Sequence, residues 1–165
     1  MSNLNKVVRS KIKKLLLALF LGISSPINAD LLVSFIDEMS LPYEFSPSNY
    51  ENSPSNYKNS VNNYENSDSN YNNSSANYSN SSSSGKPLLI EEDGELISLG
   101  HYVLSEGGVT NIYSSSGDRI FYNPKKGIGV YHGTSGEFCG VLALVKNKYR
   151  LVLTEVGKKA LFMAQ

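Results

Sequence analysis

Residues 108–122 read GVTNIYSSSGDRIFY, and residues 127–141, nineteen positions further on, read GIGVYHGTSGEFCGV. Each copy has an apolar run, then a small residue, a glycine and an acid, and then a second apolar run. Glycine at that place supplies the positive φ of a tight turn, so each copy predicts a hairpin. Because a hairpin cannot bury its apolar face alone, the copies have to pack against each other.

The same alternation of short β-rich runs and turn signals extends over residues 86–165. Asp93-Gly94 begins a weaker third copy, and Asp-Gly is a strong hairpin turn. This spacing predicts a mainly β domain, an antiparallel meander of about eight strands that could close into a barrel. The expected strands cover residues 88–90, 96–99, 101–104, 109–113, 119–122, 128–132, 137–145, 149–154 and 159–163.

A seven-residue repeat at residues 46–80, followed by a serine run at residues 81–84, precedes this domain. Five units follow one another in a single frame, SPSNYEN, SPSNYKN, SVNNYEN, SDSNYNN and SSANYSN. A coiled coil needs two apolar positions in seven, and these units offer one, a tyrosine. The tract has almost no aliphatic residues with which to offset chain entropy, so we expect residues 46–85 to be a disordered linker.

The first 45 residues divide into two segments. Residues 1–29 have a basic start, an apolar run of nine residues from Leu15 to Ile23, and a small residue, Ala29, at the expected cleavage point. This layout predicts a secretory signal peptide, with an uncleaved membrane anchor as the alternative. Residues 30–45 are apolar, and we expect one short helix docked on the β-domain or a sticky segment. The mature chain would lie in the periplasm or outside the cell.

Charge and cysteine content exclude several classes of function. Lysine plus arginine and aspartate plus glutamate each number 15, but five of the basic residues fall within residues 1–29. The rest of the chain therefore has ten basic and fifteen acidic residues, which argues against nucleic acid as a partner. One cysteine excludes an intrachain disulfide and any zinc site with two thiolates. We expect no metal and no cofactor.

Cys139 and His132 are the only weak candidates for a catalytic site. They flank the Thr134-Ser135-Gly136 turn of one expected hairpin, so the thiol and the imidazole could approach each other across the strands. In the nineteen-residue alignment, however, Cys139 falls on Ile120 and Ile97, which indicates a position facing the core. The sequence favours a buried, unreactive thiol over a nucleophile.

The run SPSNYENSPSNYKNS, supported by GVTNIYSSSGDRI, resembles a group of small exported bacterial proteins with tandem SPSNYxN repeats and a short β-rich C-terminal domain. The resemblance implies an exported bacterial protein and carries over no catalytic residues. We expect a non-enzymatic module whose β-domain binds an envelope component or a protein partner. Two alternatives are a self-assembling surface protein driven by the repeat and an envelope enzyme that uses Cys139 and His132.

Overall fold

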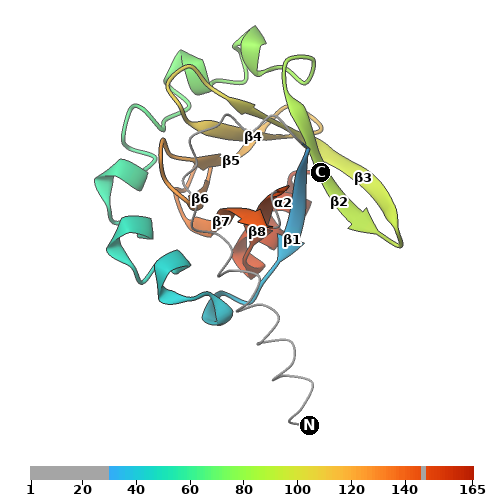
Figure 1. The fold of residues 1–165 in the computed structure, drawn as a ribbon. Coiled ribbons are helices and arrows are strands. Elements are labelled where there is room, and N and C mark those ends of the chain that lie inside the picture. Colours follow the sequence, from blue (N-terminus) through green and yellow to red (C-terminus); the bar gives the residue numbers. More distant parts are fainter. Residues whose placement is uncertain (1–29, 146–147) are drawn as a thin grey trace.

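The computed structural model describes residues 30–145 and 148–165, which form an eight-stranded closed barrel. The repeat, residues 46–80, forms a series of short turns around one side of the barrel, which we call the belt. Figure 1 shows the barrel end-on and the belt as an arc outside it. The expectation of a mainly β, barrel-like fold is confirmed. The expected signal peptide, residues 1–29, lies outside the described residues. The strands are β1 (Leu31–Phe35), β2 (Lys86–Glu92), β3 (Glu95–Leu104), β4 (Thr110–Ser114), β5 (Arg119–Asn123), β6 (Gly129–His132), β7 (Phe138–Val145) and β8 (Lys148–Leu153).

Strands β2 to β8 form the expected meander, in which each strand is antiparallel to the next. Asp93 and Gly94 have φ values of 51° and 84°, as a type I′ hairpin turn requires. Gly140 has a φ of 153°, and a Cβ there would collide with the Val152 carbonyl of β8. Glycine thus allows the close strand approach that curls the sheet into a barrel.

β1 closes the barrel from outside the meander. It lies between β2 and β8 and is parallel to both. Leu31 and Val33 point into the core beside Leu88 and Leu151. The expectation of one short helix over residues 30–45 is therefore wrong, because residues 31–35 form a strand whose alternate residues complete a buried sheet. The stretch does dock on the β-domain, as expected, through Ile36, Leu41 and Phe45.

The segment after β1 packs against the barrel wall. Two 3₁₀ turns, η1 (Glu38–Ser40) and η2 (Tyr43–Phe45), carry the chain from β1 into the belt. The side chains of Ile36, Leu41 and Phe45 are buried in a second apolar cluster with Val141 and Val152. The belt then begins at Ser46, already anchored to the barrel.

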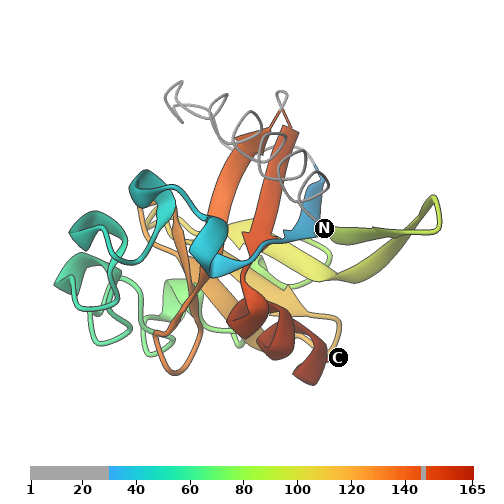
Figure 2. The same cartoon turned by 90° about the horizontal axis from the view of Figure 1, so that it is seen from below.

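The C-terminal segment is a helix rather than the strand expected over residues 159–163. Helix α2 spans Glu155–Met163 and is capped by Thr154, whose hydroxyl accepts a hydrogen bond from the Gly157 amide at 3.4 Å. Figure 2 shows α2 at one end of the barrel, where Leu161 is fully buried in the core. The short apolar run predicted a strand, but the threonine cap and the helix-forming residues after it favour a helix.

Candidate functional site: a belt of asparagines and a row of exposed tyrosines

The five heptapeptide units are ordered, so the expectation of disorder over residues 46–85 is wrong. Each unit makes one turn from its Tyr-X-Asn segment, a 3₁₀ helix in four units and a hydrogen-bonded turn in the third. In the second unit, the Asn56 side chain accepts a bond from the Lys58 amide at 3.2 Å and so caps the turn. The 3₁₀ turns of the belt are η3 (Tyr50–Asn52), η4 (Tyr57–Asn59), η5 (Tyr71–Asn73) and η6 (Tyr78–Asn80).

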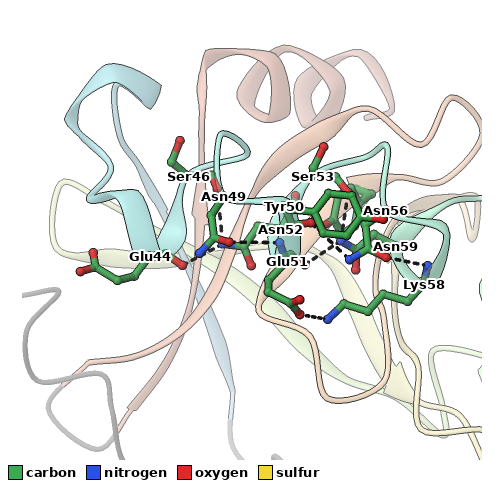
Figure 3. Close-up of polar contacts among 11 residues, drawn as sticks. Glu44, Ser46, Asn49, Tyr50, Glu51, Asn52, Ser53, Asn56, Lys58 and Asn59 are labelled. Carbon is green, nitrogen blue, oxygen red and sulfur yellow. Dashed lines mark hydrogen bonds and ion pairs between the residues drawn. The ribbon is translucent and has the colours of Figure 1, made fainter.

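The last asparagine of each unit ties that unit to the one before it. The Asn59 amide donates to the carbonyls of Glu51 and Ser53, at 2.8 and 3.0 Å. Figure 3 shows this arrangement for the first two units. The same pair of bonds recurs at Asn52, Asn66, Asn73 and Asn80. The asparagine side-chain amides thus supply hydrogen-bond donors for backbone carbonyls of the belt. These bonds explain how so polar a repeat is ordered without an apolar core of its own.

The belt docks on the outer wall of the barrel through the backbone carbonyls of these asparagines. The Tyr122 hydroxyl donates to the Asn59 carbonyl at 2.7 Å, and the His101 Nε2 donates to the Asn80 carbonyl at 2.8 Å. Tyr131 bonds Asn52 and Tyr113 bonds Asn73 in the same way, both at 2.8 Å. We call these barrel side chains the docking ladder. It crosses strands β6, β5, β4 and β3 in turn.

Arg119 lies in this interface beside the docking ladder. Its Nε donates to Asn111 Oδ1 at 2.7 Å, and its guanidinium lies 4.9 Å from the centre of the Tyr122 ring. Its Nη1 and Nη2 are buried without a hydrogen-bond partner, and burial lowers the pKa of the guanidinium from its ordinary value. Among the described residues, Asn66 is the one closing asparagine whose carbonyl receives no bond from the barrel.

The outer surface of the belt carries one tyrosine from each unit, and we call these five residues the tyrosine row. The exposed fractions are 63% for Tyr50, 65% for Tyr57, 64% for Tyr64, 62% for Tyr71 and 77% for Tyr78. Within the described residues, no hydrogen bond holds any of their hydroxyls. The first four values are nearly equal, so these rings are exposed to the same extent along the arc.

The structure places Cys139 and His132 on neighbouring strands but does not engage the imidazole with the thiol. Cys139 is fully buried, and its Sγ donates to the Glu137 carbonyl at 3.4 Å. Burial, followed by the Glu137 charge, raises the pKa of this thiol to about 12, while the His132 backbone N–H opposes the rise. The His132 ring instead accepts through Nδ1 from the Ser135 amide at 3.2 Å, so it caps its own turn.

The alignment that placed Cys139 in the core is correct for two of its three positions. Ile120 is 3% exposed and Cys139 is fully buried, but Ile97 lies on the projecting β2–β3 hairpin and is 42% exposed. The mixed-polarity cleft beside α2, of about 520 Å³, includes His132, Glu137 and Lys159 among its lining residues. No group of three or more residues that could hold a metal occurs within residues 30–145 and 148–165.

Sequence reasoning missed the ordered belt and its docking ladder. One signal was available in the repeat itself. Positions one, four, five and seven keep Ser, Asn, Tyr and Asn in all five units, whereas positions two, three and six vary. Three of the constant positions bond backbone groups, as a folded repeat requires. Comparison with family models, curated proteins and solved structures found no match for this chain.

The helices of the described part of the chain are all too short or too polar to cross a membrane.

Proposed function

We propose that this chain is an exported, non-enzymatic binding protein whose tyrosine row docks on a linear polysaccharide of the bacterial envelope. One comparison within the repeat carries the proposal. Position six is exposed in four of the five units and varies freely, as Glu51, Lys58, Glu65, Asn72 and Ser79. The tyrosine beside it is equally exposed but never varies. Backbone hydrogen bonding accounts for the constant asparagines but not for the constant tyrosine, so a ligand is the better explanation.

Tyrosine suits a sugar polymer for chemical reasons. Its ring face is apolar and can stack on the C–H face of a sugar, and its hydroxyl can bond a sugar hydroxyl. A tyrosine side chain also loses little conformational entropy when it is bound. Rings at regular positions match a ligand that repeats regularly, and five weak contacts on one rigid arc add up to useful avidity.

The acidic balance outside residues 1–29 supports a polysaccharide over a nucleic acid, which would stack on tyrosine equally well but would be repelled by its phosphate on every nucleotide. Export rests on the basic and apolar pattern of residues 1–29. The buried thiol, with its pKa raised to about 12, gives the enzyme alternative no support.

A second candidate function is self-assembly, in which the tyrosine row of one copy packs against that of another. The same exposed aromatic surface favours it, because contiguous exposed apolar area marks interaction sites. The two candidates differ in what the row contacts, and one set of variants separates them.

The test compares two variants that alter neighbouring positions of the belt. The row variant combines Tyr50→Ser, Tyr57→Ser, Tyr64→Ser, Tyr71→Ser and Tyr78→Ser. The control variant combines Glu51→Ser, Lys58→Ser and Glu65→Ser, which are also exposed positions of the same turns. Co-sedimentation uses purified peptidoglycan sacculi and, separately, microcrystalline cellulose.

We expect the unaltered chain and the control variant to pellet with at least one polysaccharide, and the row variant to lose at least tenfold in affinity. Equal pelleting of the row variant, or no pelleting of the unaltered chain, would contradict the proposal. If the unaltered chain forms oligomers that the row variant does not form, without binding either polysaccharide, self-assembly is the function instead.

A further inference from the structure

The barrel is built from the meander β2–β8 and from β1, which comes from the N-terminal part of the chain and closes the meander. The meander β2–β8 has an open seam, because β2 and β8 do not pair with each other. β1 fills the seam, with two residue pairs to β2 and four to β8. Until β1 is in place, both edges of the seam present unpaired backbone groups and the core residues behind them are open.

The strand, the apolar contacts and the hydrogen-bond acceptors described above lie within residues 31–80, which we call the clasp. β1 supplies the closing strand, Ile36 and Phe45 supply apolar contacts, and the belt supplies four carbonyl acceptors. These acceptors are main-chain atoms of the same residue type. A clasp from another copy of the chain would present the identical set of groups to the barrel.

The clasp is joined to the meander by one short connection, residues 81–85, which reads SSSSG. Ser82, Ser83 and Ser84 are exposed. The amides of Ser84 and Gly85 donate to the Ser81 carbonyl, so these bonds stay within the connection. Serine and glycine linkers are flexible as a class, so this connection can open by giving up the two bonds to Ser81 and the packing of Gly85 against the His101 ring.

Closure of the seam is a long-range event in folding. Ser34 of β1 and Arg150 of β8, which hydrogen-bond at 3.2 Å, are 116 residues apart in the chain. Contacts of such separation form late, because the loop that they close carries a large entropy cost. This entropy cost reduces the advantage of intrachain closure, so pairing of the seam with β1 of a second copy competes with it.

We propose that the clasp is exchanged between two copies of this chain, giving an intertwined dimer in which each barrel is closed by the partner's β1. Exchange preserves the contacts between clasp and barrel, so its cost lies in the connection at residues 81–85 and in the entropy lost when two chains associate. The dimer would carry two belts.

The test joins two chains by a disulfide that only an exchanged clasp allows. One chain carries Leu32→Cys and the other, of different length, carries Arg150→Cys, and both carry Cys139→Val. Leu32 and Arg150 are direct partners in the β1–β8 pairing, at a spacing that a disulfide can bridge. The two chains are unfolded, mixed, refolded together, oxidised and separated on a non-reducing gel.

We expect a mixed disulfide of the two chains after co-refolding and none after mixing the folded chains. Leu104→Cys, on the exposed end of β3, replaces Leu32→Cys in the control and sets the level of random pairing. The proposal is overturned if the mixed disulfide does not exceed that level, while one chain with both cysteines closes its own disulfide. If the chain with both cysteines does not form its own disulfide, the gel cannot report on exchange. The molar mass of the unaltered chain, measured by light scattering after refolding, then tests the proposal. A dimer fraction that rises with refolding concentration supports exchange, and a single-chain mass throughout refutes it.

Discussion

The hydroxyl of Tyr122, on β5, donates a 2.7 Å hydrogen bond to the backbone carbonyl of Asn59, a residue 63 positions earlier in the belt. The acceptor is a main-chain atom, so the barrel holds the repeat by a group that every unit possesses. The Asn59 side chain is left free to bond the previous unit. One residue type therefore builds the belt with its amide and anchors it with its carbonyl.

Tyr122→Phe should destabilise the protein by about 1 to 3 kcal/mol, because the Asn59 carbonyl would stay buried without its donor. The matched control is Tyr57→Phe, which removes a hydroxyl from an exposed ring in the repeat unit that contains Asn59. It should change the free energy of unfolding by less than about 0.5 kcal/mol. Denaturant unfolding measures both free energies. Equal effects would mean that the docking bond contributes nothing.

Asn66→Ala tests the side-chain bonds between units apart from docking, since the Asn66 carbonyl receives no bond from the described residues of the barrel. Its amide donates to the carbonyls of Lys58 and Ser60 at 2.8 and 3.0 Å. Its loss should cost about 1 to 3 kcal/mol. Asn62→Ala, an exposed change in the same unit, should cost less than about 0.5 kcal/mol. Comparable unfolding midpoints for the two variants would show that the Asn66 side-chain bonds do not stabilise the belt.

The Cys139 thiol should resist modification in the folded protein at neutral pH, because burial raises its pKa to about 12 and the thiolate is the reactive form. Cys139→Val should leave polysaccharide binding unchanged and shift stability by about 1 kcal/mol. Labelling with a thiol reagent, with and without denaturant, checks the first point. Rapid labelling of the folded chain, slowed by His132→Gln, would revive the enzyme alternative.

Stability should fall in alkali. Burial raises the pKa of Tyr102 and Tyr113 from 10.0 to about 12, and that of Cys139 from 9.0 to about 12. Burial also raises the pKa of Tyr122 and Tyr131. Between these pKa values the folded chain binds more protons than the unfolded chain. The stabilisation that these groups contribute is therefore fully present below about pH 9 and is lost towards pH 12.

Each group contributes roughly 1.4 kcal/mol per pKa unit to this decline. Denaturant unfolding between neutral pH and pH 11 measures the slope, and Tyr113→Phe should make it shallower. A stability that does not vary over this range would contradict the burial of these phenols.

The hairpins of the meander could be predicted because their signals are local. Asp93-Gly94 marks a turn by its own backbone preference, and the alternation of apolar residues on either side fixes the faces of the strands. The sequence could not place β1, since its partners in β2 and β8 lie far along the chain and parallel pairing leaves no local mark.

The belt could not be predicted by counting apolar residues, because its order does not come from apolar burial within the repeat. Asn59 and its equivalents replace that burial with two bonds each to backbone carbonyls, and the barrel supplies the remaining contacts. The candidate site was accessible only in part. Constant tyrosines are visible in the sequence, but their exposure becomes clear only once the asparagines beside them are seen to face inward.

Amide hydrogen exchange across residues 46–84 tests most directly whether the repeat is a folded belt rather than a spacer. We predict slow exchange for Asn52, Asn59 and Asn73, whose amides donate backbone bonds within their units and whose carbonyls are held by the barrel. Tyr122→Phe should speed exchange around Asn59 more than around Asn80. Complete exchange of the repeat within seconds, while β4 and β5 stay protected, would contradict the account and leave the repeat a disordered linker.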